Sequence, residues 1–324
     1  MIVIVVGVVL ISAILIIGGT LPLNPAASQT SPNRPTTAIA TSAPTVANDI
    51  ISPQPSASAT TMTTPGTAEK LSAEIASQMD VIQQQVSGIR GLQLKTTLQR
   101  ALMTPEELKN KVVNDFFKDY TDADVQRDVK VLSTFGLIEP DFDLKNFYIK
   151  LYQEQVAGYY DSKTKEMYVI AGEKFGGTER LTYAHEFNHA LQDQNYDMEN
   201  GLKLNNDYCK NETEYCAAVT ALIEGDSSLL EQDWFIQYST QQDQQDLRDF
   251  QSTYSSPVYD SAPSFMKEDF LFPYNQGTDF VTMLYKSGGR KAVDGAFKAP
   301  PVDTEQILHP EKYPADKPVK VEMP

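Results

Sequence analysis

Basic side chains and histidines are scarce in this chain, and the shortage of basic charge excludes one class of function at once. The 324 residues include 43 acidic side chains against 27 lysines and arginines, which gives a formal net charge of −16. Such a chain repels phosphate backbones and anionic lipid head groups, so we expect no nucleic-acid partner. Histidine occurs only three times, and two of the three lie four residues apart, at positions 185 and 189.

Charged side chains are absent from residues 1–23. An apolar run of this length matches the hydrocarbon core of a bilayer, and we expect one transmembrane helix that attaches the protein to a membrane. A secretory signal peptide is the alternative, but its hydrophobic region is usually shorter and follows a positive segment that is missing here. No lysine or arginine occurs before Arg34, so charge asymmetry does not set the orientation of the span.

Aromatic residues are absent from residues 24–66, where only Arg34 and Asp49 are charged and Ser, Thr, Pro and Ala prevail. Such a stretch cannot bury enough apolar surface to offset chain entropy, so we expect a disordered linker. As a coil it would reach on the order of 35 Å. A tether of this composition is typical of the outside of a cell. We therefore expect an extracytoplasmic catalytic domain on a single-pass anchor, or a secreted one if the first segment is cleaved.

Residues 67–140 show the apolar spacing of helices. From Leu71 to Ile89, apolar residues recur at steps of three and four, which predicts a helix with one apolar stripe. The stretch Thr104-Pro105-Glu106-Glu107 is typical of a helix start, and Thr121 with Asp124 resembles a second one. We therefore expect residues 67–140 to form a helical segment that leads into the next part of the chain.

Residues 155–171 break the helical rhythm. Two runs rich in Val, Tyr and Ile flank the polar residues 161–165, which predicts a strand hairpin. Helices are expected again after Gly176 and then over residues 217–237, 241–251 and 276–287. A hairpin placed directly before a helix that bears paired histidines indicates an α+β catalytic domain over residues 141–324.

The two cysteines, Cys209 and Cys216, lie seven residues apart. In an exported protein they would close a small disulfide loop, worth about 2.5 kcal/mol on the loop-entropy argument. Two buried thiols are the alternative.

The histidine pair lies in the stretch YAHEFNHALQDQ, residues 183–194. On a helix, His185 and His189 project from one face a turn apart and can direct their ring nitrogens at one ion. Zn²⁺ is the natural guest, because it accepts imidazole and leaves a fourth position for water in hydrolytic sites. Glu186 is rotated by about 100° from the first histidine, which places it beside that water as a general base.

A third ligand must come from elsewhere in the chain, either from His309 or from an acidic side chain. Glu224 lies in an apolar part of the stretch AALIEGDSSLLEQDW, where an unpaired carboxylate would be costly and coordination would remove the cost. Asp226, Glu231 and Asp233 compete with it, although the last two are more typical of a solvated helix face.

The stretch HEFNH, followed downstream by IEGDSS, resembles the glutamate zincins (gluzincins), a clan of HExxH zinc metallopeptidases. Residues 272–289 are also similar to the PYxxG stretch of the aminopeptidase branch. The resemblance covers roughly residues 155–297 and implies a zincin-like fold. It also implies His185, His189 and Glu224 as zinc ligands, Glu186 as base and Tyr274 as oxyanion donor. A neutral phenol can indeed donate to developing negative charge at neutral pH.

Two features of the clan are missing from this chain. There is no GAMEN-like run to hold a free amino terminus, so exopeptidase specificity is not implied. Ser228 stands four residues after Glu224, where the thermolysin pattern has an aspartate. Asp193 or Asp226 is the alternative partner for an imidazole, as metal histidines usually need one.

The favoured hypothesis from the sequence is a zinc metallopeptidase, with endopeptidase specificity, in which a zinc-activated water attacks a peptide bond of a peptide or protein substrate. Two other readings stay open. One is a membrane-tethered binding protein with a structural metal site, which would have four protein ligands rather than three. The other is a zinc hydrolase that acts on substrates other than peptides. His309, which precedes a proline near the end of the chain, is a candidate for a second contact to substrate.

Overall fold

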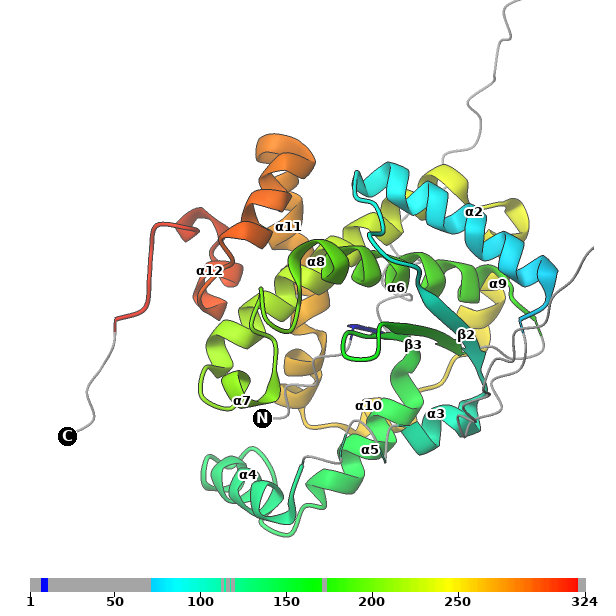
Figure 1. Cartoon of the computed structure of the whole chain (residues 1–324). Helices are drawn as coiled ribbons and strands as arrows, with labels where there is room; N and C mark the ends of the chain where they lie inside the picture. Colours follow the sequence, from blue (N-terminus) through cyan, green and yellow to red (C-terminus); the bar gives the residue numbers. More distant parts are fainter. Residues whose placement is uncertain are drawn as a thin grey trace, which may run out of the picture. The chain divides into compact units, whose positions relative to one another are not determined.

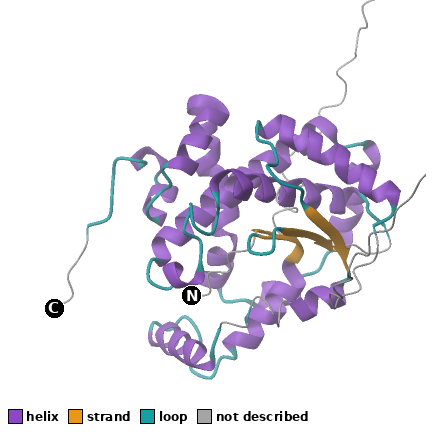
Figure 2. Cartoon of the chain, in the orientation of Figure 1, coloured by secondary structure: helices purple, strands orange, loops and turns teal. Residues whose placement is uncertain are grey.

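The computed structural model describes residues 7–10, 71–111, 114, 117, 120–170 and 174–319. In this part of the chain a small sheet is covered by many helices, so the α+β class expected from the sequence is correct (Figures 1 and 2). Residues 71–319, as far as they are described, belong to one compact unit. The linker predicted over residues 24–66 lies outside the described residues.

The sheet has the strand order β1-β3-β4-β2. Strands β3 (Val156–Asp161) and β4 (Glu166–Ile170) form the predicted hairpin, with Gly158 opposite Val169. Strand β2 (Gln99–Met103) pairs parallel to β4. Its residues belong to the segment expected to be helical, and that expectation is wrong for them. Their short run carries no helical periodicity of its own, and the open edge of β4 decides their conformation.

Strand β1 (Gly7–Leu10) pairs antiparallel to β3 at the other edge of the sheet. These four residues are part of the run in which the sequence predicted a transmembrane helix, so the structure differs from that prediction here. The rest of residues 1–23 lies outside the described part of the chain. An edge strand offers unpaired backbone groups, and a valine-rich run is suited to pair with them. Among the described residues, no helix has the length and apolar character to cross a bilayer.

Helical N-termini follow the capping signals of the sequence. Thr104 and Glu107 bond each other's backbone amides at 3.2 and 2.8 Å, and Thr121 and Asp124 do the same at 3.2 Å each. The helices are α2 (Ala73–Arg90), α3 (Pro105–Lys111), α4 (Asp122–Thr134), α5 (Leu144–Gln155), α6 (Gly177–Tyr196), α7 (Asn206–Cys209), α8 (Thr213–Tyr238), α9 (Gln241–Thr253), α10 (Pro257–Ser261), α11 (Ser264–Lys298), α12 (Thr304–Leu308) and the 3-10 turn η2 (Pro310–Lys312).

Helix α11 is much longer than the segment 276–287 predicted from the sequence. It begins before Pro273 and includes that residue, although proline lacks an amide donor. Its two helical stretches meet at Gly288 and Gly289, and Gly289 has a positive φ of 64°. Helix α11 runs along α8, and this pair forms the most extensive helix contact among the described residues (Figure 1).

Two glycines allow α8 and α11 to approach closely beside the centre described below. A Cβ atom on Gly277 would lie 2.2 Å from the carbonyl oxygen of Ala221, and one on Gly225 would lie 2.1 Å from the carbonyl oxygen of Gly277. Both distances are shorter than any van der Waals contact, and the atoms met are backbone atoms. The two helices must therefore separate if either glycine gains a side chain.

We expect Gly277→Ala to lower the free energy of unfolding by about 1 to 3 kcal/mol, because the added methyl group overpacks the α8–α11 contact. Urea or thermal unfolding measures the change. Gly295→Ala is the matched control, because a Cβ there meets no atom within 4 Å in the same helix. That control should be more stable by about 0.5 to 1 kcal/mol. Equal stability of both variants would contradict the close approach.

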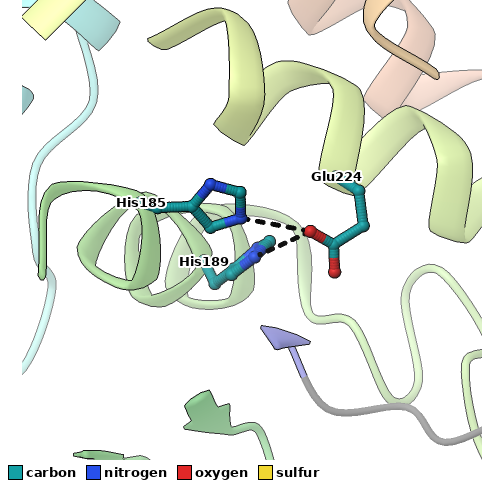
Figure 3. Close-up of side chains that lie close together, drawn as sticks. All are labelled: His185, His189 and Glu224. Atoms are coloured by element: carbon teal, nitrogen blue, oxygen red, sulfur yellow. Dashed lines mark hydrogen bonds and ion pairs between the residues drawn. The ribbon is translucent and has the colours of Figure 1, made fainter. Parts of the chain in front are cut away.

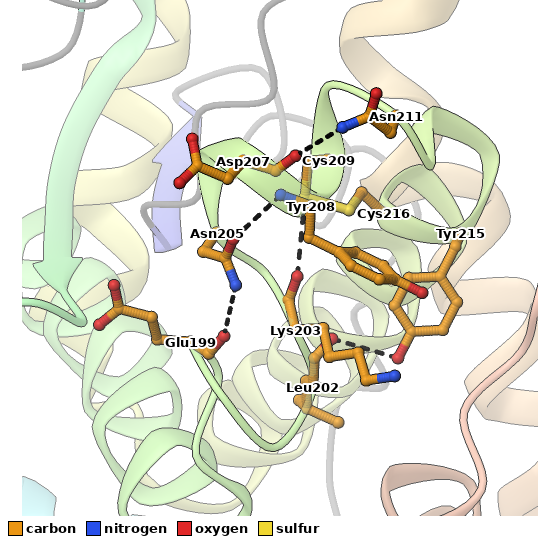
Figure 4. The surroundings of a disulfide bond; sticks show 10 residues. All are labelled: Glu199, Leu202, Lys203, Asn205, Asp207, Tyr208, Cys209, Asn211, Tyr215 and Cys216. Carbon is orange, nitrogen blue, oxygen red and sulfur yellow. Dashed lines mark hydrogen bonds between the residues drawn. A yellow bond between two sulfur atoms is a disulfide. The ribbon is translucent and has the colours of Figure 1, made fainter.

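The predicted disulfide between Cys209 and Cys216 is present, and both residues are buried. It joins α7 to the first turn of α8. Figure 4 shows the bridge beside Tyr208 and Tyr215, whose rings meet edge to face with centroids 5.5 Å apart. The bridge therefore fixes the start of the helix that carries the candidate third ligand.

Candidate metal centre

Helix α6 holds the histidine pair in the interior of the protein. It lies against β3 and β4 on one side and against α8 and α2 on others (Figure 1). His185, Glu186 and His189 are each 0 % exposed. The two imidazole rings lie a turn apart with centroids 4.8 Å from each other. The local helix geometry thus places both rings on one face, as the spacing predicts.

Glu224 meets the two imidazoles from helix α8. Its Oε2 atom lies 3.1 Å from Nε2 of His185 and 3.3 Å from Nε2 of His189 (Figure 3). In the described part of the chain, these three residues form the one group of three or more His, Cys, Asp or Glu side chains that lie close enough together to hold a metal ion. Ligand atoms at 2.0 to 2.1 Å from a tetrahedral zinc ion lie about 3.4 Å from one another. The two separations between carboxylate and imidazole are close to this value, and all three ligand atoms lie within 4.8 Å of one another.

Each imidazole has a partner for its other nitrogen. Nδ1 of His185 lies 2.7 Å from Oε2 of Glu231, and Nδ1 of His189 lies 2.9 Å from Oε1 of Gln192 and 3.2 Å from Oγ of Ser227. A carboxylate and an amide oxygen are acceptors, so both Nδ1 atoms donate. This pattern is that of metal-binding histidines, whose second nitrogen is held by a carboxylate or carbonyl group.

These partners leave the two Nε2 atoms as lone-pair acceptors that face a third acceptor, the carboxylate of Glu224. Three buried acceptors at such short distances repel one another unless a proton or a cation lies among them. His189 Nε2 has no hydrogen-bond partner. The donor set of two imidazoles and one carboxylate is one that Zn²⁺ accepts in hydrolytic sites. The residues therefore fit a divalent cation of the zinc type.

The pKa values of His185 and Glu224 reflect the same close approach of the three side chains. Burial alone would lower the pKa of His185, but hydrogen bonds to Glu224 and Glu231 outweigh it and raise that pKa to about 10. Burial alone would raise the pKa of Glu224, but the two histidines outweigh it and lower that pKa to about 2. The site thus favours positive charge beside Glu224, and a bound cation would supply it in place of a proton.

A buried ion-pair network lies behind this centre. The carboxylate of Asp226 accepts hydrogen bonds from Gln192 at 2.8 Å and from Asn188 at 3.2 Å. It also pairs with Arg90 of α2 at 2.8 Å and with Arg290 of α11 at 3.2 Å. Helix α2, which lies outside the stretch that resembles the zincins, is therefore tied to the histidine helix. Asp226 holds the glutamine that orients a histidine rather than the imidazole itself.

Glu186 lies between the histidines and strand β3. A Cβ atom on Gly158 of β3 would come within 3.3 Å of the Glu186 side chain, so the strand passes directly beside this carboxylate. Tyr274 of α11 packs in one buried cluster with Val156 and Tyr159 of β3, and its ring centroid lies 6.5 Å from that of His185. Burial, and then the charges of Glu224 and Glu186, raise the pKa of Tyr274 well above its ordinary value. The phenol is therefore a neutral donor at physiological pH.

The structure thus brings together His185, Glu186, His189, Glu224 and Tyr274, the residues that the sequence selected. It does not bring His309 to them, because that side chain is half exposed beside Glu305 and Glu311.

Three subsidiary expectations change. Glu231 is 0 % exposed and holds an imidazole, so it is not part of a solvated face. Its position two helical turns after Glu224, on the same face, was the available signal. Asp233 pairs with Arg290 at 2.9 Å, and Asp193 binds Tyr160 and Lys165 rather than a histidine.

No family model, no curated protein and no solved structure matches this chain.

Proposed function

We propose that this protein is a zinc-dependent metallopeptidase of the gluzincin type, which hydrolyses peptide bonds within polypeptides. The convergence of the two Nε2 atoms and the Glu224 carboxylate on one point carries the proposal. Three protein ligands are typical of catalytic zinc sites, whereas structural sites usually have four. This count favours the peptidase over a binding protein with a structural metal.

The roles of the side chains follow from their chemistry. His185, His189 and Glu224 would hold the ion, which when bound supplies Lewis acidity and lowers the pKa of water from 15.7 toward about 7. Glu186 accepts the proton of the attacking water and passes it to the leaving amine. Tyr274, kept neutral by its surroundings, donates a hydrogen bond to the oxyanion of the tetrahedral species.

Strand β3 supports a polypeptide as the substrate. An extended peptide can add to a sheet edge through main-chain hydrogen bonds. Strand β3 runs past Glu186, because a Cβ atom on Gly158 would lie 3.3 Å from that side chain. Strand β1 pairs with this edge through Gly7–Leu10. A substrate would therefore take the place of β1 and lie antiparallel to β3.

Residues 1–23 support a membrane anchor as a second part of the proposal. An uncharged apolar segment of this length satisfies its backbone groups either as a helix in a bilayer or by pairing with an open strand edge. We propose that it inserts in the membrane and that the catalytic part lies outside the cytoplasm. Flotation of the full chain with lipid vesicles tests this, and a protein that stays in the aqueous fraction contradicts it.

The peptidase proposal is tested with the purified full chain, casein and a mixed peptide library. We expect cleavage that a zinc chelator reduces by at least about 100-fold, because the ion activates the water, and that added Zn²⁺ restores. Mass spectrometry of the products identifies internal cleavage. A protein that binds no metal, or one that hydrolyses esters or sugars but no peptide at any metal concentration, excludes the proposal.

A further inference from the structure

A cavity of about 680 Å³ lies between the α4–α5 pair and the helices α8, α11 and α12. Its walls are largely apolar and include Leu132, Tyr148, Phe265 and Phe272. This volume lies within the range of about 300 to 1,000 Å³ that is typical of ligand-binding pockets. The cavity is distinct from the metal centre, and none of the five residues proposed for catalysis lines it.

All the charged side chains that line the cavity are acidic. Asp128, Glu214, Glu268 and Asp269 line it, and no lysine, arginine or histidine does. Asp128 and Glu214 have partners, in the hydroxyls of Tyr120 and Thr304.

Glu268 and Asp269, neighbours on α11, make no ion pair with any residue of the described part of the chain. An apolar cavity with two such carboxylates at its rim complements a cationic side chain with an aliphatic stem.

The cavity adjoins the metal centre along two helices, α8 and α11. On α8, Ala217 lines the cavity and lies on the same face as Glu224, seven residues or about 10 Å away at 1.5 Å per residue. On α11, Phe272 and Gln276 line it on either side of Tyr274 in the sequence. A peptide strand advances about 3.3 Å per residue, so about 10 Å corresponds to three residues.

We propose that this cavity binds a lysine or arginine side chain of the polypeptide substrate, together with an adjacent apolar side chain. The basic residue would lie about three residues from the bond that is cleaved. The aliphatic stem packs on Tyr148 and Phe272, and the charged end lies at Glu268 and Asp269. The inference rests on the proposed peptidase function and names its substrate class, which is polypeptides with a basic residue near the cleaved bond.

The test compares matched decapeptides that carry lysine or norleucine two, three or four residues from the cleaved bond, on either side. The full chain should cleave the best lysine peptide with a kcat/KM at least about 10-fold above that of its norleucine counterpart. The ratio should shrink as salt is added, since the carboxylates are near solvent. The double variant Glu268→Lys and Asp269→Lys should remove or reverse the preference while the norleucine peptide is cleaved as before.

The control carries the same charge change at an exposed site outside the cavity, Glu139→Lys with Asp141→Lys, and should keep the lysine preference. Binding is measured separately, by fluorescence anisotropy of the labelled peptides on the Glu186→Gln chain.

Cleavage without a lysine preference, or a preference that survives the double reversal, overturns the inference and leaves the peptidase intact. Absence of cleavage overturns the peptidase. In that case, lysine-selective binding that is abolished by the double variant still supports the cavity as a site for a basic side chain. Binding without selectivity for lysine overturns that assignment as well.

Discussion

The Glu186→Gln variant is expected to bind zinc as the parent does and to hydrolyse peptides about 100- to 10,000-fold more slowly, the usual contribution of a general base. Glutamine has nearly the same shape as glutamate but cannot accept the water's proton. The three ligand atoms belong to other side chains, so the metal centre itself is unchanged. Metal content by atomic emission and kcat on one peptide, measured on the same preparation, separate the two properties.

The control for this variant is Glu179→Gln, the same substitution in the first turn of the same helix. Glu179 accepts a bond from the Gly176 amide at 2.9 Å, which a glutamine oxygen can also accept. That variant should keep full activity. Turnover by Glu186→Gln at the parent rate would remove Glu186 from the reaction, and loss of zinc would show that it is a structural residue instead.

The Glu224→Gln variant is expected to lose zinc. The carboxylate is the only anionic ligand of the three, and it is held charged with a pKa of about 2. Its replacement leaves the cation with neutral ligands only in a buried site, which is strongly unfavourable. We expect an affinity loss well beyond the factor of about 10 to 100 that is typical of outer partners. Competition with a coloured chelator measures the dissociation constant, and hydrolysis should vanish with the metal.

Glu231→Gln provides a matched comparison for Glu224→Gln. It removes an equally buried carboxylate two turns along the same helix, where Glu231 contacts the Nδ1 atom of His185 rather than the metal side of the ring. Its zinc affinity should fall by about 10- to 100-fold. If Glu231→Gln weakens zinc binding more than Glu224→Gln does, the two carboxylates have been assigned to the wrong roles.

Several elements could be predicted from the sequence because their causes are local. The hairpin of residues 155–171 is set by alternating strand formers around a polar turn, and the helix starts at Thr104 and Thr121 are set by capping boxes that span four residues. The strand at Gln99–Met103 could not be predicted in this way. Its conformation depends on pairing with β4, which lies more than sixty residues further along the chain.

The sequence by itself determined that His185, Glu186 and His189 share one helix and that two of them face one point, because a helix fixes neighbours at four-residue spacing. Only the tertiary structure decided which distant side chain completes the trio. Helix α8 could have presented Asp226 or Glu231 instead, and its packing against α6 and α11 places Glu224 at the two Nε2 atoms. The same packing made Glu231 and Gln192 the supports of the imidazoles, because side-chain contacts across separate helices depend on how those helices meet.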